Sequence, residues 1–507
     1  MLHMLTKVFG SAVHGVEAIT ITIEVNVGQG TKFFLVGLPD NAVKESAYRI
    51  ETVIKNTGYK MPRLRTVVNM APADIRKAGA AYDLPIAVGI LAASRQVVYT
   101  REPDSYIIMG ELSLDGTLRP VRGALPMALQ ARKEGFRGMI LPWQNAGEAA
   151  MVEGLEVFAA KHIGEVVDFL QGKAGLDRQL PHAHHAQEIF DVDFAEVKGQ
   201  GTIKRAMEIA AAGGHNIILI GPPGAGKTML AKRLPSILPP LTMEEALETT
   251  KIHTVSGKLS EQLQFITNRP FRSPHHTISD VALVGGGNPP LPGEISLAHN
   301  GVLFLDELPE YKRSVLEVMR QPMEDRKVCI SRARIALEFL SNFMLVAASN
   351  PCPCGNFNHP GRECTCFPGA VQKYLNRISG PLLDRIDLHV EVTPLPPTAT
   401  FNGETSSTIR QRVVAARDIQ TARFAHQNAT MSMREIQLHC TPEPAALQLL
   451  ESAMKRLQLS ARAYERILKV SRTIADLAGQ EQITSDHIAE AIQFRTLDRG
   501  NWGRFQC

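Results

Sequence analysis

The segment NIILIGPPGAGKT, residues 216–228, constrains the fold of this 507-residue chain more than any other feature. An apolar run leads directly into the pattern G-x-x-x-x-G-K-T, in which glycines let backbone N–H groups surround phosphate oxygens. The helical stretch TMLAKRL comes next, and the positive end of its dipole points at the same phosphates. The segment therefore predicts a strand, a phosphate-binding loop and a helix within an α/β core that binds a nucleotide.

This loop and a second apolar segment assign roles to individual residues. Lys227 brings a positive charge to the β- and γ-phosphates, and the hydroxyl of Thr228 suits Mg²⁺. In GVLFLDEL, residues 301–308, an apolar strand brings Asp306 to the metal and Glu307 to the attacking water. ATP and Mg²⁺ are therefore the expected cofactors, and hydrolysis is the expected reaction. The predicted nucleotide contacts are Gly221, Pro222, Pro223, Gly224, Ala225, Gly226, Lys227, Thr228 and Met229.

Further segments resemble parts of the AAA+ ATPases. FMLVAASNP ends near Asn350 at the sensor-1 position, and LSARAYERIL places Arg462 at the sensor-2 position. SGPLLDRID contains Arg385, which would reach the nucleotide of a neighbouring subunit as an arginine finger. Arg377 competes for that role, and a helix-surface arginine is the alternative for both. FAEVKGQ, residues 194–200, resembles the adenine-pocket segment. The resemblance implies an AAA+ core with a helical lid that works as a ring, a homo-hexamer.

A longer signature lies between the two nucleotide motifs. It reads RPFRSPHHTISDVALVGGGNPPLPGEISLAHNG, and NPCPCG, SGPLLDRID and SRTIADL follow it. With these motifs, essentially the whole chain resembles the ComM/YifB family of magnesium-chelatase-like AAA+ ATPases. The resemblance implies an ATP-driven DNA translocase or helicase that promotes branch migration in homologous recombination during natural transformation. It implies single-stranded and branched DNA as partners and makes recombination proteins candidate partners.

The glycines and prolines of this signature predict a shaped loop or hairpin tip. They are Gly285, Gly286, Gly287, Pro289, Pro290 and Pro292. Arg272, His275 and His276 are donors suited to phosphate contacts, and related rings project such insertions into the pore. One hypothesis is that these three residues grip DNA. The alternative, a structural role or a place at a subunit interface, stays open.

Residues 1–172 form a mixed α/β block that resembles Lon-type protease domains. The resemblance rests on PADIRKAGAAYDLPIAVGILAAS and GELSLDGTLRPVRGALPMALQARKEG. Lon proteases use a serine nucleophile and a lysine base. Residues 79–83 read GAAYD without a serine, and Leu125, Pro126 and Met127 stand where the lysine should be. The nearest lysine, Lys133, is further along the same predicted helix. The resemblance therefore implies an inactive Lon-like (ribosomal S5 domain 2-like) α+β domain that serves as a ring-forming scaffold or DNA guide.

Three other blocks complete the expected organisation. Residues 173–189 form a polar linker. Its histidines at 182, 184 and 185 have a spacing that could bind a metal, but a solvated connector is the preferred interpretation. Residues 190–394 hold the α/β core with its insertion and cysteine cluster. Residues 398–507 have helical periodicity throughout and form the predicted lid, in which Thr484 caps a helix. In the first block, Arg76, Lys77 and Arg119 are candidate phosphate contacts, although solvated surface charge is the preferred interpretation.

Four of the seven cysteines lie close together as C-x-C, nine residues, C-x-C. Cys352, Cys354, Cys364 and Cys366 predict a structural Zn²⁺ site, because four thiolates can fold a loop too small for its own core. His359 is an alternative ligand, and four reduced cysteines without metal are the alternative interpretation.

Composition narrows the remaining choices. The net charge of +4 permits a nucleic-acid partner without requiring one. No run is long and apolar enough to span a membrane, and the first residues lack a secretion signal. The seven cysteines, an odd number, do not form a secreted disulfide framework, so a reducing cytoplasm is the expected location. Two other functions remain open. One is a chelatase-type motor that inserts a metal into a tetrapyrrole, and the other is an ATP-dependent protease or protein remodeller. The missing serine and lysine argue against proteolysis.

Overall fold

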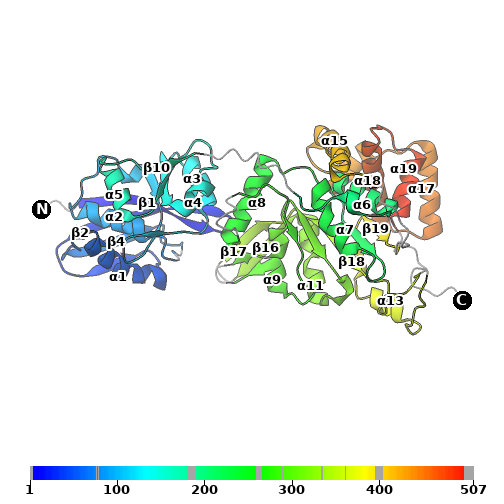
Figure 1. The fold of residues 1–507 in the computed structure, drawn as a ribbon, viewed down its shortest axis with the longest axis horizontal. Helices are drawn as coiled ribbons and strands as arrows, with labels where there is room; N and C mark the ends of the chain where they lie inside the picture. The colour runs from blue at the N-terminus through cyan, green and yellow to red at the C-terminus, as the bar shows by residue number, and fades with distance from the viewer. Residues whose placement is uncertain are drawn as a thin grey trace. The chain divides into compact units, whose positions relative to one another are not determined.

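The chain forms two compact units (Figure 1). The computed structural model describes residues 4–75, 77, 79–180, 190–258, 265–287, 290–332, 335–359, 361–393 and 403–495. The first unit contains Met1–His185 and Ala246–Ile266, and the second contains Ala186–Glu245 and Thr267–Cys507. The linker histidines at 182, 184 and 185, together with Arg76 and Pro289, lie outside the described residues.

The first unit is built on an eight-stranded mixed sheet in the order β10-β9-β8-β5-β1-β2-β4-β3. The hairpin of β1 and β2 is antiparallel, whereas β5, β8 and β9 run parallel to β1 and to one another. The strands are β1 (Met4–His14), β2 (Glu17–Gly28), β3 (Phe33–Val36), β4 (Arg65–Ala71), β5 (Tyr106–Ile108), β8 (Gly138–Pro142), β9 (Glu156–Ala160) and β10 (Asp177–Gln179). The short pair β6 (Glu111–Leu112) and β7 (Leu118–Arg119) lies apart from this sheet.

Helices of this unit pack on the sheet through apolar faces. In α1, the carboxylate of Asp40 accepts a hydrogen bond from the Val43 N–H at 2.8 Å and so caps the helix. Helices α2 and α3 pack against β1 and β2, and Leu247 from residues Ala246–Ile266 packs against the same core. The helices are α1 (Asn41–Asn56), α2 (Asp83–Ala93), α3 (Ala124–Lys133), α4 (Trp143–Ala149) and α5 (Ile163–Leu170), with the turn η1 (Pro103–Ser105). Helix α8 (Met243–Ser256) supplies most of its length to this unit.

The second unit has a five-stranded, all-parallel sheet in the order β12-β15-β18-β11-β19. Its three central strands are buried at every residue, which suits a parallel sheet that is covered on both faces. All three are apolar runs that the sequence predicts as strands. The strands are β11 (Ile217–Ile220), β12 (Phe271–Arg272), β15 (Val302–Leu305), β18 (Met344–Ser349) and β19 (Leu388–Glu391).

Short elements surround this sheet. The described residues of the signature segment form one small hairpin, β13 with β14, and short helices, and β16 pairs with β17 as a separate ribbon. These elements are η2 (Phe194–Glu196), α6 (Gly201–Gly213), α7 (Lys227–Arg233), η3 (Leu234–Ile237), α9 (Asp280–Val284), β13 (Gly285–Gly286), β14 (Leu291–Pro292), α10 (Glu294–Leu297), η4 (Leu308–Glu310), α11 (Arg313–Val318), α12 (Arg320–Asp325), β16 (Lys327–Arg332), β17 (Ile335–Leu340), α13 (Ala370–Leu375) and α14 (Gly380–Leu383).

The carboxyl-terminal part of the second unit is helical, as its periodicity predicts. Helices α15 and α18 pack on α6, and α19 packs on both α17 and α18. Thr484 precedes α19, and its backbone N–H donates to the His487 ring at 3.1 Å. The elements are α15 (Ser406–Phe424), η5 (Asn428–Thr430), α16 (Met433–His439), α17 (Pro444–Leu457), α18 (Ala461–Leu477) and α19 (Ser485–Gln493). Among the described residues, the helices are all too short or too polar to cross a bilayer.

Candidate functional site

The predicted phosphate-binding loop lies at the carboxyl edge of the parallel sheet of the second unit. It follows β11, while Asp306 follows β15 and Asn350 follows β18, and these three strands are neighbours in the sheet. Gly224 and Gly226 have φ angles of 79° and 87°, which favour glycine and let the backbone curl before α7 begins at Lys227. The sheet therefore brings the separately predicted residues to one place.

Lys227 is held inside this loop. Its ammonium donates to the carbonyl oxygens of Gly221 at 2.5 Å and Pro222 at 3.0 Å, and to Oδ1 of Asn350 at 3.1 Å. Burial lowers the pKa of Lys227, and the nearby carboxylates of Asp306 and Glu307 oppose that shift. The predicted sensor residue and the predicted phosphate-binding lysine are thus in direct contact.

A hydroxyl and a carboxylate meet beside this lysine. The Thr228 hydroxyl donates to Oδ2 of Asp306 at 2.7 Å, and the other oxygen of Asp306 accepts from the Glu307 N–H at 3.0 Å. Such hard oxygen ligands suit Mg²⁺, and the loop amides with Lys227 suit phosphate oxygens. The residues therefore fit the expected cofactors. Thr228 and Asp306 would hold the metal, and residues 221–229 would hold the nucleotide phosphates.

Glu307 has a neighbour that sequence reasoning missed. Glu307 itself has a φ of 52°. Its side chain is 52% exposed, so the carboxylate can reach a water molecule. Nδ1 of His276 lies 3.5 Å from Oε2 of Glu307, and the rings of His275 and His276 are in tilted contact with centroids 4.1 Å apart. The contact arises because β12 pairs in parallel with β15, so the chain after β12 reaches the same sheet edge. A two-residue strand is too short to show an alternation of apolar and polar residues, so no sequence pattern predicts this contact.

Arg272 lies in β12 and not on an isolated loop. Its guanidinium forms a bidentate ion pair with Glu294, with distances of 2.6 and 2.8 Å, and the side chain is 31% exposed. The hypothesis that Arg272, His275 and His276 contact DNA stays a prediction. For Arg272, it requires that the guanidinium be shared with Glu294 or released from it.

The two candidates for the arginine finger differ in exposure. Arg385 pairs with Glu324 at 2.5 Å and donates to the Pro381 carbonyl, which leaves its side chain 12% exposed. Arg377 pairs with Glu310 at 2.9 Å and is 54% exposed. A role in trans would therefore require Arg385 to leave Glu324.

The segment that contains Arg385 is tied to α18 by ion pairs on both sides. Arg462, the predicted sensor-2 residue, lies 3.3 Å from Asp384, and Arg466, one helical turn later, lies 2.9 Å from Asp387. Burial alone would raise the pKa of Asp387, but Arg466 and His215 hold it below the usual value. Asp384 and Asp387 therefore join the segment that contains Arg385 to α18.

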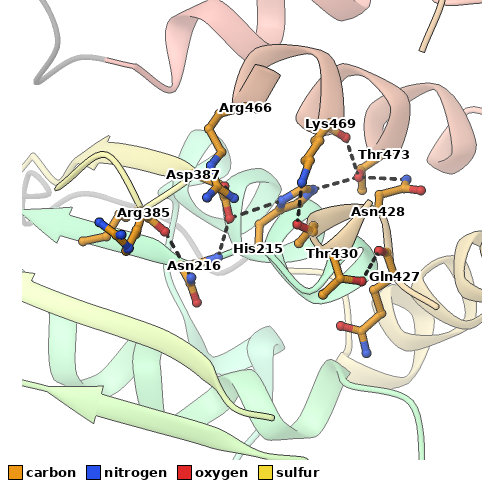
Figure 2. A network of polar contacts seen from close by, with 12 residues as sticks. His215, Asn216, Arg385, Asp387, Gln427, Asn428, Thr430, Arg466, Lys469 and Thr473 are labelled. Atoms are coloured by element: carbon orange, nitrogen blue, oxygen red, sulfur yellow. Dashed lines mark hydrogen bonds and ion pairs between the residues drawn. The ribbon is translucent and has the colours of Figure 1, made fainter. Parts of the chain in front are cut away.

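Figure 2 shows how this junction continues into a buried polar network. The Asn216 N–H donates to Asp387 at 3.0 Å, and the Asn216 side chain donates to the Arg385 carbonyl at 3.1 Å. His215 lies 2.8 Å from the Thr473 hydroxyl, and burial lowers the pKa of its ring. The network therefore fixes the start of β11 and of β19 to α18.

The four clustered cysteines converge on one point. Their Sγ atoms all lie within 4.8 Å of one another, and Cys352 is fully buried with Phe357 and Val371. The loop also contacts the phosphate-binding loop, because a Cβ on Gly355 would lie 2.6 Å from Cδ of Pro223. The cluster can bind a metal, and its loop packs directly on the nucleotide site.

The Lon-like positions of the first unit hold other contacts. Leu125 is buried in α3, and its N–H donates to the Glu148 carboxylate at 2.8 Å. Asp83, within the GAAYD stretch, is buried and pairs with Arg49 at 2.8 Å. The interpretation of Lys77 as a solvated surface charge is wrong, since the residue is fully buried and donates to the Pro72 carbonyl.

Comparisons with known proteins match almost the whole chain. The family model described as magnesium chelatase, subunit ChlI, matches residues 193–400, and the model of its C-terminal part matches residues 403–495. A further model, subunit ChlI of Mg-chelatase, matches residues 23–145. The competence protein ComM of Haemophilus influenzae is 45% identical over 506 residues, which cover 98% of each chain. YifB of Escherichia coli is 45% identical over 501 residues, again 98% of each chain.

Two shorter matches concern parts of the chain. Lon protease 2 of Bacillus subtilis is 28% identical over 127 residues, which are 25% of this chain and 22% of that protein. The Holliday junction branch migration complex subunit RuvB of Thermosipho melanesiensis is 30% identical over 142 residues, 27% of this chain and 34% of that protein. Both are local likenesses.

Proposed function

Because the chain belongs to the magnesium-chelatase-like AAA+ family that includes ComM and YifB, we propose that it is a motor that uses ATP hydrolysis to move DNA strands. Membership of this family implies ATPase activity. The finer proposal is a DNA translocase or helicase that promotes branch migration in homologous recombination during natural transformation. Such a motor would work in the cytoplasm on single-stranded and branched DNA.

The geometry around Lys227 is the observation that carries the proposal. Lys227 contacts Asn350, Thr228 contacts Asp306, and Glu307 follows with an exposed carboxylate. In the proposed reaction, Lys227 and the loop amides hold the phosphates and Asn350 orients Lys227. Glu307 takes the proton of the attacking water. When bound, Mg²⁺ would be held by Thr228 and Asp306 and would supply positive charge to the phosphates.

We place the complete reaction between neighbouring subunits of a homo-hexamer. Arg385 from one subunit would stabilise charge that develops on the nucleotide of the next. Arg462 in α18 would read the same nucleotide as sensor 2. The ion pairs of Asp384 and Asp387 with α18 support this proposal, since they connect the finger segment of each subunit to its own helical lid.

DNA is the proposed load for two reasons. The relatives that match over nearly their full length include a competence protein, and a shorter match is to a branch-migration subunit. The proposed architecture is an AAA+ P-loop core with a helical lid, preceded by a Lon-like domain. The Lon-like domain would act as a scaffold or DNA guide, because residues 79–83 contain no serine nucleophile.

The second candidate function is a chelatase-type motor for metal insertion, or another AAA+ remodeller. The family models that match carry the magnesium-chelatase description, which favours this candidate. The competence relative and the local match to Lon protease 2 favour DNA. A motor of the chelatase type would respond to a porphyrin-binding partner and not to DNA.

ATP turnover with and without DNA separates these functions. We expect single-stranded or branched oligonucleotides to raise steady-state phosphate release several-fold in the wild-type protein, because a DNA motor hydrolyses ATP faster when it is bound to DNA. The Lys227→Ala protein should remain folded and release no phosphate above background under any condition. Wild-type turnover that ignores DNA but rises with a porphyrin-binding partner would favour the alternative.

We further propose that Cys352, Cys354, Cys364 and Cys366 hold a structural Zn²⁺. Four convergent thiolates in a loop with a minimal core are the ligand set of such sites.

Protein purified without chelator should contain about one zinc per chain by elemental analysis. Cys364→Ser should lower that content and also weaken ATP binding, because the loop packs on Pro223 through Gly355. Cys329→Ser is the matched control, since Cys329 is an exposed free cysteine outside the cluster. Purified wild-type protein without zinc would refute this proposal.

A further inference from the structure

A cavity lined by three arginines lies at the edge of the parallel sheet opposite the phosphate-binding loop. It borders Gly301 and Met344, at the amino ends of β15 and β18, whereas the phosphate-binding loop follows the carboxyl end of β11. Arg269, Arg326 and Arg417 line it together with the amides of Asn300, Asn342 and Gln427. Every one of these residues belongs to the second unit. No role proposed above uses this cavity.

The three guanidinium groups differ in how many of their N–H donors have an acceptor in the protein. Arg269 pairs with Glu245 at 2.9 Å and donates to three carbonyl oxygens, so its charge and donors are matched. Arg417 directs Nε and Nη2 to the Ala211 carbonyl, and Arg326 directs Nη1 to the Phe343 carbonyl. Among the described residues, Nη1 of Arg417 and Nε and Nη2 of Arg326 have no acceptor, and neither residue has a carboxylate partner.

Both arginine side chains are half-buried, and the protein around them reduces the solvation of their charges. Burial lowers the pKa of Arg417 to about 9, and the neighbouring charge of Arg269 lowers it further, while Glu245 opposes both. Burial also lowers the pKa of Arg326. An ion of opposite sign would stabilise such unpaired charges, because water solvates them only in part. The site therefore favours an anion that accepts several N–H bonds at once.

The cavity has room for a small ligand, and its donors indicate the class of anion. The cavity is partly open to solvent, and its volume is about 30 Å³. This volume exceeds the roughly 10–15 Å³ that one water molecule needs. Guanidinium forks match the oxygens of phosphate and carboxylate groups. The amides of Asn300 and Asn342 already donate to Glu245 and to Asn300, so the two arginines are the main donors. We propose that this cavity is a second anion site, which binds one phosphoryl oxyanion between Arg326 and Arg417.

Such a ligand would join parts of the unit that are distant in sequence. Arg417 lies in α15, and Arg326 lies between α12 and β16. Gln427 precedes η5, whose residue Ala429 accepts a hydrogen bond from Lys469 in the network of Figure 2. A bound oxyanion would therefore tie the helical part to the sheet, and it should raise the thermal stability of the protein.

Binding of labelled inorganic phosphate to the full-length Lys227→Ala protein tests the proposal. The Lys227→Ala background weakens phosphate binding at the P-loop, which would otherwise mask a second site. We expect one saturable site whose affinity falls at least about tenfold in Arg326→Gln or Arg417→Lys, since each change removes a fork of donors. The control Arg412→Gln removes a guanidinium from the same helix as Arg417, outside the cavity, and should bind phosphate unchanged.

A structural readout protects the test against misfolded variants. Crystals of the wild-type protein soaked in selenate should show an anomalous peak between Arg326 and Arg417. An excess of single-stranded oligonucleotide that displaces the labelled phosphate would identify a nucleic-acid phosphodiester as the source of the oxyanion. Phosphate that stays bound would identify a free phosphate. Absence of saturable binding, or equal affinity in both arginine variants and the Lys227→Ala parent, would overturn the proposal.

Discussion

Replacement of Glu307 by glutamine should lower the rate of ATP hydrolysis by about 100-fold or more, the range expected for loss of a general base. The amide has the shape of the carboxylate but cannot accept the proton of the attacking water. ATP binding should remain, because Lys227 and residues 221–229 are unchanged. Steady-state phosphate release and binding of a fluorescent ATP analogue measure the two effects separately.

The contact between His276 and Glu307 gives this prediction a sharper form. His276→Ala should lower turnover only modestly, because His276 would act by positioning the Glu307 carboxylate 3.5 Å away. In the Glu307→Gln background, the same change should have no further effect, which a double-mutant cycle detects. Equal effects of His276→Ala in both backgrounds would separate His276 from Glu307. Wild-type turnover in Glu307→Gln would remove Glu307 from the reaction.

Arg385→Ala should lower ATP turnover by about 10³-fold, the lower end of the range for arginine fingers. The finger supplies positive charge to the transition state of a neighbouring subunit, so each Arg385→Ala subunit would leave its neighbour's site incomplete. The matched control is Arg377→Ala, which removes the competing, more exposed arginine and should cost less than tenfold. Phosphate release by each purified variant measures both effects.

Mixed rings distinguish a finger from a merely structural arginine. The Arg385→Ala and Lys227→Ala proteins should each hydrolyse ATP at no more than a trace rate, but a mixture should recover part of the activity. In a mixed ring, some sites combine an intact Lys227 with an intact Arg385 from the next subunit. A structural role for Arg385, in which it only holds Glu324 at 2.5 Å, would give no recovery. Normal turnover in Arg385→Ala alone would contradict the assignment outright.

The parts of the site that the sequence predicts are those that lie within short, contiguous motifs. Lys227 and Thr228 come after an apolar strand and the phosphate-binding loop, and Asp306 and Asn350 each follow another apolar strand directly. A polar residue at the end of a buried parallel strand must lie at the carboxyl edge of the sheet. The contact between Lys227 and Asn350, 123 residues apart, was therefore within reach of sequence reasoning.

The parts that could not be predicted depend on which elements become neighbours. The position of His276 beside Glu307 follows from β12 pairing with β15, which no residue pattern announces. The ion pairs from Asp384 and Asp387 to α18 join segments that are 78 and 79 residues apart. The sequence suggests that Lys77 is a surface lysine. In the structure its backbone forms a parallel β-bridge with Pro39, and its side chain is buried and donates to the Pro72 carbonyl. Each case reflects tertiary packing, not local preference.

Migration of a synthetic four-way DNA junction tests the central claim most directly. The wild-type protein with ATP and Mg²⁺ should convert a labelled junction with homologous arms into separated duplexes. Conversion should fail without ATP and in the Lys227→Ala protein. If the wild-type protein hydrolyses ATP at full rate yet leaves every junction intact, the proposal that this nucleotide site drives the movement of DNA strands is wrong.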